Sequence, residues 1–239
     1  MKWIIASLLL ATSCIAQQPV MAVYDVSQIP QAKEVALSRR QKGKSPLVAI
    51  LNVNSGPGTV SMRRKLLEWQ PANSVISAGY VDLDDSSGRV RKPDAIKADV
   101  QIWKNAGVQM IFLDDAHAWD DSKRANALRS TVEYASKGFP PSKIIINAGE
   151  VIGKSSQWMR TGYIVCDFED PINYLKSENK GQMWLAFVSG GDSASYLLGV
   201  AKKRGVRFVG FDLLANWKTP RKEWQTPLPQ SIITLLKSL

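Results

Sequence analysis

Carboxylates and amides are the residue types whose placement in this chain could support chemistry. They follow apolar runs, as in Leu113-Asp114-Asp115 and Phe168-Glu169-Asp170. Two carboxyl groups brought together can act as a general acid and as a base or nucleophile. The chain has one histidine, His117, and two cysteines, Cys14 and Cys166, so a zinc site of several His or Cys ligands cannot form. We expect neither a metal nor a cofactor, and we interpret His117 as a loop residue.

Eight short runs of apolar, β-branched and aromatic residues recur at fairly even spacing and predict eight strands. Several are apolar throughout, which is typical of strands covered on both faces of a parallel sheet. Helical signals lie between most of them, such as Pro93 at the start of one helix and Gly205 after another. Eight strand–helix units favour a single (β/α)8 barrel of the TIM type over residues 23–239, rather than an open doubly wound sheet. The expected strands are Ala22–Val26, Leu47–Val53, Val75–Val81, Val108–Asp114, Lys143–Ala148, Tyr163–Phe168, Met183–Val188 and Val206–Asp212, and further helices are expected over Asp120–Ser136, Ser193–Arg204 and Pro229–Leu239.

Polar residues follow the carboxyl ends of most of these strands. In a parallel barrel these ends meet at one face, where active sites form. A single polar strand end carries little information, because strands become polar as they approach solvent. Several ends that hold mostly Asp, Glu and Asn favour a site. The candidates are Asn52, Asn54, Tyr80, Asp114, Asp115, Asn147, Asp167 and Glu169.

The same strand ends carry motifs of a known family. Leu51–Gly58 reads L-N-V-N-S-G-P-G and resembles the N-P-N-S-G-P-G signature of spherulin-4-like proteins. Ile111–Asp115 resembles that family's F-L-D-E strand end, and G-Y-V at Gly79, N-A-G at Asn147 and F-E at Phe168 follow in the family's order. The resemblance covers Val48 to Glu169. It implies a TIM-barrel glycoside hydrolase, related to the endo-α-1,4-polygalactosaminidases, that cleaves α-1,4-linked polysaccharides containing galactosamine or N-acetylgalactosamine.

The chain departs from the family pattern at a few positions. Asp115 stands where the family usually has Glu, and its side chain is one methylene shorter. Val53 and Ala148 replace prolines. The change at Asp115 matters most, because a carboxylate displaced by about 1 Å can miss its target.

Glycoside hydrolases typically use two carboxyl groups, and the resemblance suggests which ones serve here. We assign Asp114 as the nucleophile or base. We assign Glu169 as the general acid, because its apolar neighbour Phe168 favours the protonated form. Asp115 and Asp167 would tune the charge or bind sugar hydroxyls.

Amides and aromatic residues near the strand ends are the candidates for binding sugar. Asn52, Asn54 and Asn147 could hydrogen-bond hydroxyl or N-acetyl groups, or could instead stabilise turns. Tyr80 is a candidate site residue, and Trp119 and Trp217 could stack on sugar rings. Trp103, on a predicted helix face, is interpreted as a core residue.

Two other functions stay open. One is a carbohydrate-binding barrel without activity, in which the change at Asp115 marks the loss of catalysis. The other is a phosphate-binding barrel enzyme, because Ser189-Gly190-Gly191-Asp192 precedes a predicted helix whose N–H groups could bind phosphate. Asp192 would repel a phosphate, so this alternative is the weaker one.

Residues 1–22 have the features of an export signal. Lys2 is followed by a short apolar run, far below the roughly 18–20 residues that span a bilayer. Cleavage after Ala16 or Ala22 would release a soluble protein, whereas Ala11-Thr12-Ser13-Cys14 resembles a lipobox with Cys14 as the lipidated residue. We therefore expect an exported protein, whether secreted, periplasmic or anchored as an outer-membrane lipoprotein.

The net charge of +10 has no concentrated source in the sequence. Arg39-Arg40, Arg63-Arg64-Lys65, Lys202-Lys203-Arg204 and Arg221-Lys222 are short and scattered. A solvated basic surface is the simpler interpretation, and we expect no nucleic-acid partner. The expected partner is a polysaccharide substrate, bound by a monomer whose only membrane attachment is a lipid.

Overall fold

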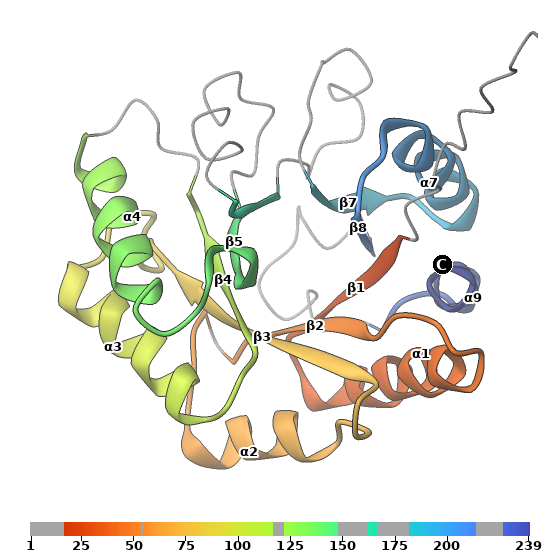
Figure 1. Ribbon diagram of the computed structural model, residues 1–239, viewed down its shortest axis with the longest axis horizontal. Helices are drawn as coiled ribbons and strands as arrows, with labels where there is room; N and C mark the ends of the chain where they lie inside the picture. The colour runs from red at the N-terminus through yellow and green to blue at the C-terminus, as the bar shows by residue number, and fades with distance from the viewer. Residues whose placement is uncertain (1–16, 54, 117–121, 148–161, 167–181, 214–226) are drawn as a thin grey trace, which may run out of the picture.

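The computed structural model describes residues 17–53, 55–116, 122–147, 162–166, 182–213 and 227–239. Eight parallel strands form a closed barrel in chain order, with β8 paired to β1 (Figure 1). This closure confirms the predicted (β/α)8 barrel and excludes the open sheet. The strands are β1 (Gln18–Val23), β2 (Leu47–Leu51), β3 (Val75–Asp82), β4 (Met110–Asp114), β5 (Ile144–Asn147), β6 (Ile164–Cys166), β7 (Met183–Val188) and β8 (Phe208–Leu213).

The first strand begins earlier than the sequence pattern predicted. β1 starts at Gln18 rather than Ala22, because the polar side chains at its start find partners: Gln17 Nε2 donates to Val206 O at 3.1 Å and Gln18 Nε2 to Pro46 O at 2.9 Å. The expected boundary between residues 22 and 23 therefore falls inside β1. Cleavage after Ala22 would remove most of this strand, whereas cleavage after residue 16 leaves it whole.

Asp25, expected within the first strand, instead caps the short 3-10 helix η1 (Val26–Gln28). Its Oδ1 accepts a hydrogen bond from Ser27 N at 2.8 Å, and Gln28 Oε1 accepts one from Asp25 N at 3.2 Å. This reciprocal pair is a capping box, which satisfies N–H groups that a helix start leaves open. The cap turns the chain from β1 into the first α-helix.

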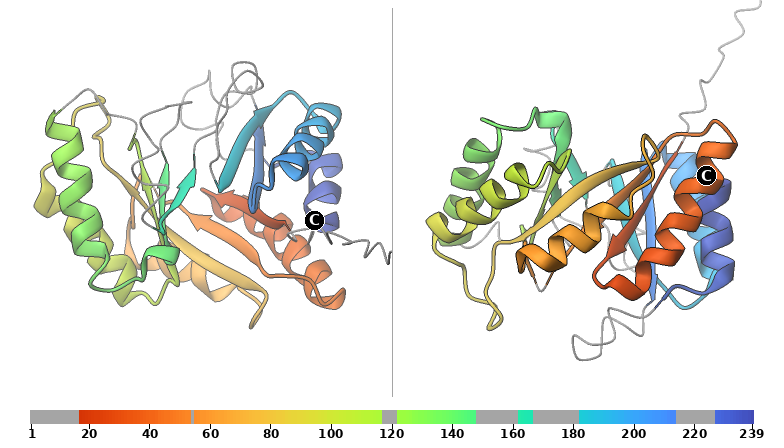
Figure 2. Two further views of the ribbon diagram at one scale, coloured as in Figure 1. Left: turned by 45° about the horizontal axis from the view of Figure 1, so that its top comes forward. Right: turned by 90° about the horizontal axis from the view of Figure 1, so that it is seen from below.

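Helices cover the outside of the barrel. Pro93 opens α3 as predicted, and Gly205, with φ of 70°, ends α7 in the left-handed conformation that favours glycine. Figure 2 shows α1 and α9 side by side against the barrel, so the last helix closes the layer beside the first. The helices are α1 (Ile29–Gln41), α2 (Val60–Glu68), α3 (Pro93–Asn105), α4 (Ser122–Ala135), α7 (Gly191–Arg204) and α9 (Gln230–Ser238), with a second 3-10 turn, η2 (Pro141–Lys143).

Two apolar layers hold this architecture together. The larger lies between the barrel and the helices, and the smaller fills the barrel interior with residues such as Val48, Tyr80 and Phe112. Trp103 of α3 is fully buried in the outer layer, as predicted, and packs directly on Gly79 of β3. A Cβ at Gly79 would lie 2.4 Å from the Trp103 ring, so only glycine permits this contact. Within the described residues, no helix is long and apolar enough to cross a membrane.

Candidate active site at the barrel mouth

The alternation of side chains along four neighbouring strands builds a polar layer at the carboxyl end of the barrel. Side chains two positions apart point to the same side of a strand. The apolar interior therefore gives way to polar residues two positions further on. Ile50, Tyr80, Phe112 and Ile145 belong to the interior cluster, and Asn52, Asp82, Asp114 and Asn147 follow them on β2, β3, β4 and β5 or directly after.

Asp114 is the centre of this layer. The hydroxyl of Tyr80 donates a hydrogen bond to its Oδ2, and Nδ2 of Asn147 donates one to its Oδ1 at 2.6 Å. Two neighbouring strands thus hold the carboxylate of a third. The structure brings these three predicted residues together, and both oxygens of Asp114 have a fixed direction.

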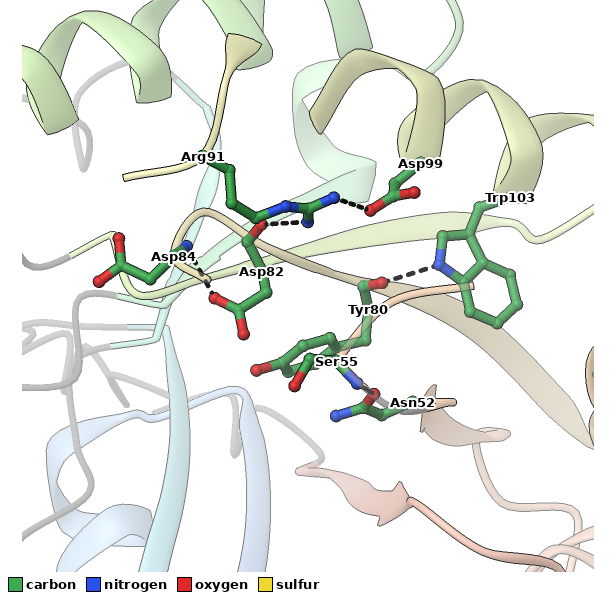
Figure 3. A network of polar contacts seen from close by, with 8 residues as sticks. All are labelled: Asn52, Ser55, Tyr80, Asp82, Asp84, Arg91, Asp99 and Trp103. Carbon is green, nitrogen blue, oxygen red and sulfur yellow. Dashed lines mark hydrogen bonds and ion pairs between the residues drawn. The ribbon is translucent and has the colours of Figure 1, made fainter. Parts of the chain in front are cut away.

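Tyr80 is itself held firmly. Its ring stacks on Phe112, with centroids 5.7 Å apart, and meets the edge of Tyr24 at 6.3 Å. Trp103 Nε1 donates to the main-chain oxygen of Tyr80 at 2.8 Å, as Figure 3 shows. Burial, and then the charge of Asp114, raise the pKa of the Tyr80 hydroxyl well above its ordinary value. The hydroxyl therefore stays protonated and remains a donor to Asp114.

Asp82 is a site residue that the sequence candidates did not include. It pairs with Asp114 in the β3–β4 register and is only 6% exposed. Its Oδ1 accepts a hydrogen bond from Asp84 N at 2.9 Å (Figure 3). The signal in the sequence was the alternation itself, because Asp82 stands two residues after the inward-facing Tyr80.

Three carboxyl groups are therefore crowded at this point of the mouth. Burial, followed by the charge of Asp114, raises the pKa of Asp82 to about 8, and a hydrogen bond between Asp82 and Asp115 acts in the same direction. Burial and the charge of Asp115 raise the pKa of Asp114 to about 6, whereas the hydrogen bonds from Tyr80 and Asn147 oppose them. The cluster retains a proton near neutral pH, and Asp114 is the member whose ionised form is best supported by donors.

Strained backbone borders the cluster on two sides. Asp115 has φ of 53° and Ser55 has φ of 63°, both in the left-handed region that residues other than glycine rarely adopt. Ala116 N donates to Asn147 O at 3.0 Å, which holds the turn after Asp115. Backbone strain of this kind concentrates at functional sites.

Asn52 stabilises a turn. Its Oδ1 accepts a hydrogen bond from Ser55 N at 2.8 Å (Figure 3), so the amide oxygen stabilises the turn, as one of the two interpretations predicted. The side chain is 7% exposed and belongs to the polar layer. Asn52 therefore shapes the loop after β2 beside the carboxylates.

A pocket of about 370 Å³ opens between the loops after β2 and β3. Its wall includes the ion pair of Arg91 Nη2 with Asp99 Oδ2, at 2.7 Å, and Arg91 also donates to Asp82 O at 2.7 Å. Figure 3 shows Arg91 spanning between these two partners. The described lining residues come from the loops after β2 and β3 and from α3, and are Ser55, Gly56, Pro57, Gly58, Asp84, Asp85, Ser86, Arg91, Asp99 and Ile102.

Several predicted residues lie outside the described part of the chain. They are Cys14, Asn54, His117, Trp119, Asp167, Glu169 and Trp217. The predicted glycine pair lies at the start of α7, where Gly190 N donates to Ser193 Oγ at 3.2 Å and Asp192 occupies the first turn. The serine hydroxyl thus occupies an N–H that a phosphate would need. Among the described residues, no group of three or more His, Cys, Asp or Glu side chains is arranged to hold a metal ion.

Fold and site together define a (β/α)8 barrel with a carboxylate cluster at its mouth. The chain belongs to spherulation-specific family 4, because the model of that family, Spherulin4, matches residues 33–209. No curated protein matches the chain significantly.

Solved structures share the barrel at low sequence identity. A truncated 3-deoxy-D-arabino-heptulosonate 7-phosphate synthase from Thermotoga maritima is 11% identical, with 93% of this chain and 84% of that chain covered and a TM-score of 0.53. Morphinone reductase in complex with tetrahydroNAD is also 11% identical, with 91% and 92% covered and a TM-score of 0.51. At this identity the likeness establishes the fold alone.

Proposed function

We propose that this protein is an exported glycoside hydrolase that cleaves α-1,4-linked polysaccharides containing galactosamine or N-acetylgalactosamine. The observation that carries the proposal is Asp114, a half-buried carboxylate at the barrel mouth fixed by donors from Tyr80 and Asn147. Membership of spherulation-specific family 4 supports the choice of substrate class.

The geometry suits Asp114 to the role of nucleophile or base. A nucleophilic carboxylate must be ionised and must keep its orientation, and two hydrogen-bond donors provide both properties. Tyr80 and Asn147 are therefore positioning residues. Burial and the charge of Asp115 keep the pKa of Asp114 above that of an ordinary aspartate, which favours its action as a nucleophile on the anomeric carbon or as a base toward water.

The second carboxyl group of the reaction is proposed to be Glu169. It would protonate the leaving glycosidic oxygen, while Asp114 acts on the anomeric carbon or through water. Asp115 is proposed to act through charge, since it contributes to the raised pKa of Asp114 and is hydrogen-bonded to Asp82. This role tolerates the shorter side chain that distinguishes the chain from its family.

The substrate path is proposed to extend from Asp114 toward the pocket between the loops after β2 and β3. The pocket has room for a sugar ring, and its rim carries both hydrogen-bond donors and acceptors, as in Arg91 and Asp84. Asn54, in the segment after β2, and Trp119, Asp167 and Trp217, which follow β4, β6 and β8 in the sequence, are proposed to add further contacts.

The test is a panel of amino-sugar polymers incubated with the purified protein, with reducing ends measured over time. We expect new reducing ends from the α-1,4-galactosamine polymer and none from β-linked chitin or chitosan. Binding of the polymer should be measured in parallel. Tight binding of the galactosamine polymer without release of ends would contradict the hydrolase and support the non-catalytic carbohydrate-binding barrel.

A further inference from the structure

The connections between helices and strands gather basic side chains at the end of the barrel opposite the mouth. In a parallel barrel all of these connections lie at the amino ends of the strands. Four of them, counted together with the last residues of α1, α3 and α7 as 39–46, 104–109, 137–143 and 202–207, contain no Asp or Glu. Their exposed bases are Arg40, Lys42, Lys104, Lys137, Lys202, Lys203, Arg204 and Arg207, with Lys44 and Lys143 partly exposed, and we call this set the basic end.

Two basic runs that are far apart in the sequence meet there. Besides its own burial, the charges of Arg39, Lys42 and Lys202 lower the pKa of Lys44, which places the connection after α1 within electrostatic reach of α7. Lys104 extends over Gly138, beside Lys137, so the connections after α3 and α4 are also adjacent. The bases of these four connections therefore lie together at one end of the barrel.

Helix stability explains only part of this charge. Bases in the last turn of a helix interact favourably with its dipole, which accounts for Lys202, Lys203 and Arg204. Lys42 and Arg207, in contrast, lie beyond the last residues of α1 and α7, respectively. They point to an anionic partner.

The described chain enters the barrel between two of these connections. Gln18 N donates to Arg207 O at 2.8 Å, and Gln18 Nε2 donates to Pro46 O at 2.9 Å. Gln17 and Gln18 therefore lie between the two most basic connections. Cys14, which is outside the described residues, precedes Gln17 by three positions in the sequence and follows the apolar run.

We propose that the basic end binds an anionic phospholipid surface and directs the mouth of the barrel away from it. Each basic side chain near such a surface strengthens binding about fivefold at physiological salt. The acids Asp84 and Asp114 at the mouth reinforce the orientation, because an anionic surface repels that end.

A phospholipid surface fits better than a polynucleotide. Proteins that bind single-stranded nucleic acid stack its bases on exposed aromatic side chains. Within the described residues of the four connections, Phe139 is the single aromatic residue, and its side chain is buried, with 5% exposed. The point of chain entry among the bases adds a second argument, since a lipid on Cys14 would bring this same end to a membrane.

Sedimentation of the full-length protein with vesicles tests the proposal. Vesicles of phosphatidylcholine are compared with vesicles of equal parts phosphatidylcholine and phosphatidylglycerol, at low and high salt. We expect binding to the anionic vesicles that weakens with salt, and little binding to the neutral ones. The double variant Lys42→Gln/Lys203→Gln should bind the anionic vesicles about 25-fold more weakly.

The matched control removes two exposed bases from the mouth side, as Arg89→Gln/Lys92→Gln. It carries the same net charge as the test variant and should bind as tightly as the wild type. Equal losses in both variants would overturn the proposal, because net charge alone would then explain binding. Equal affinity for neutral vesicles, or binding to transfer RNA that anionic vesicles do not displace, would also overturn it.

Discussion

Replacement of Asp82 by asparagine is expected to stabilise the protein at neutral pH. Asn has nearly the same shape, so its oxygen can still accept the hydrogen bond from Asp84 N, and its amide can donate to Asp115. The variant removes a buried carboxyl group whose ionisation is opposed by its burial and by the negative charge of Asp114. The expected gain in the free energy of unfolding follows from the pKa of Asp82.

The magnitude and its sign come from proton linkage. Asp82 has a pKa of about 8 in the folded protein, against about 3.9 for an unfolded Asp. A carboxyl group whose pKa is raised by folding lowers stability above the unfolded pKa; this cost grows until the pH reaches the folded pKa and is constant above it. At pH 7 the ceiling is about 4 kcal/mol, from about 3 pH units at about 1.4 kcal/mol each. The proton can partly be shared with Asp114, so we expect Asp82→Asn to gain about 2 kcal/mol.

Urea unfolding at several pH values measures this gain. The difference between variant and wild type should be near zero at about pH 4 and below, and should grow up to about pH 8. Asp85→Asn is the matched control, because its exposed carboxyl group has a pKa lowered to about 2, first by its hydrogen bond from Ser87. That control should not gain stability as pH rises. A gain for Asp82→Asn that does not depend on pH, or a loss of stability at pH 7, would show that folding does not raise the pKa of Asp82.

Two further substitutions test the packing and the hydrogen bond that hold the site in place. Gly79→Ala should destabilise the protein by about 1–3 kcal/mol, measured by urea unfolding, because its Cβ would meet the Trp103 ring at 2.4 Å; a neutral effect would contradict this packing. Tyr80→Phe removes a donor to ionised Asp114, so the acid limb of the pH–rate profile should move up by about one pH unit. An unchanged acid limb would show that Tyr80 does not support the charge of Asp114.

The fold could be predicted from the sequence because its elements are locally encoded. The apolar runs matched most strands to within a few residues, and Pro93 and Gly205 marked helix limits where expected. The predicted start of β1 was wrong, because Gln17 and Gln18 are buried and hydrogen-bonded to main-chain oxygens that only the closed barrel brings near them.

The candidate site was predicted only in part, for a related reason. Asp114, Tyr80 and Asn147 were identified from strand ends, and the structure joins them by hydrogen bonds. Asp82 was missed because its importance comes from pairing with Asp114 on the next strand, which the sequence does not show. The concentration of bases at one end likewise depends on barrel closure, which brings distant connections together.

Turnover by Asp114→Asn tests whether Asp114 is the nucleophile or base of the reaction. The initial rate of reducing-end release from α-1,4-galactosamine polymer is compared between wild type, Asp114→Asn and the exposed control Asp94→Asn, all with their thermal midpoints recorded. We predict a loss of roughly a thousandfold for Asp114→Asn, with the folded structure retained, and no loss for Asp94→Asn. Near-normal turnover by folded Asp114→Asn would contradict the assignment of Asp114 as the nucleophile or base.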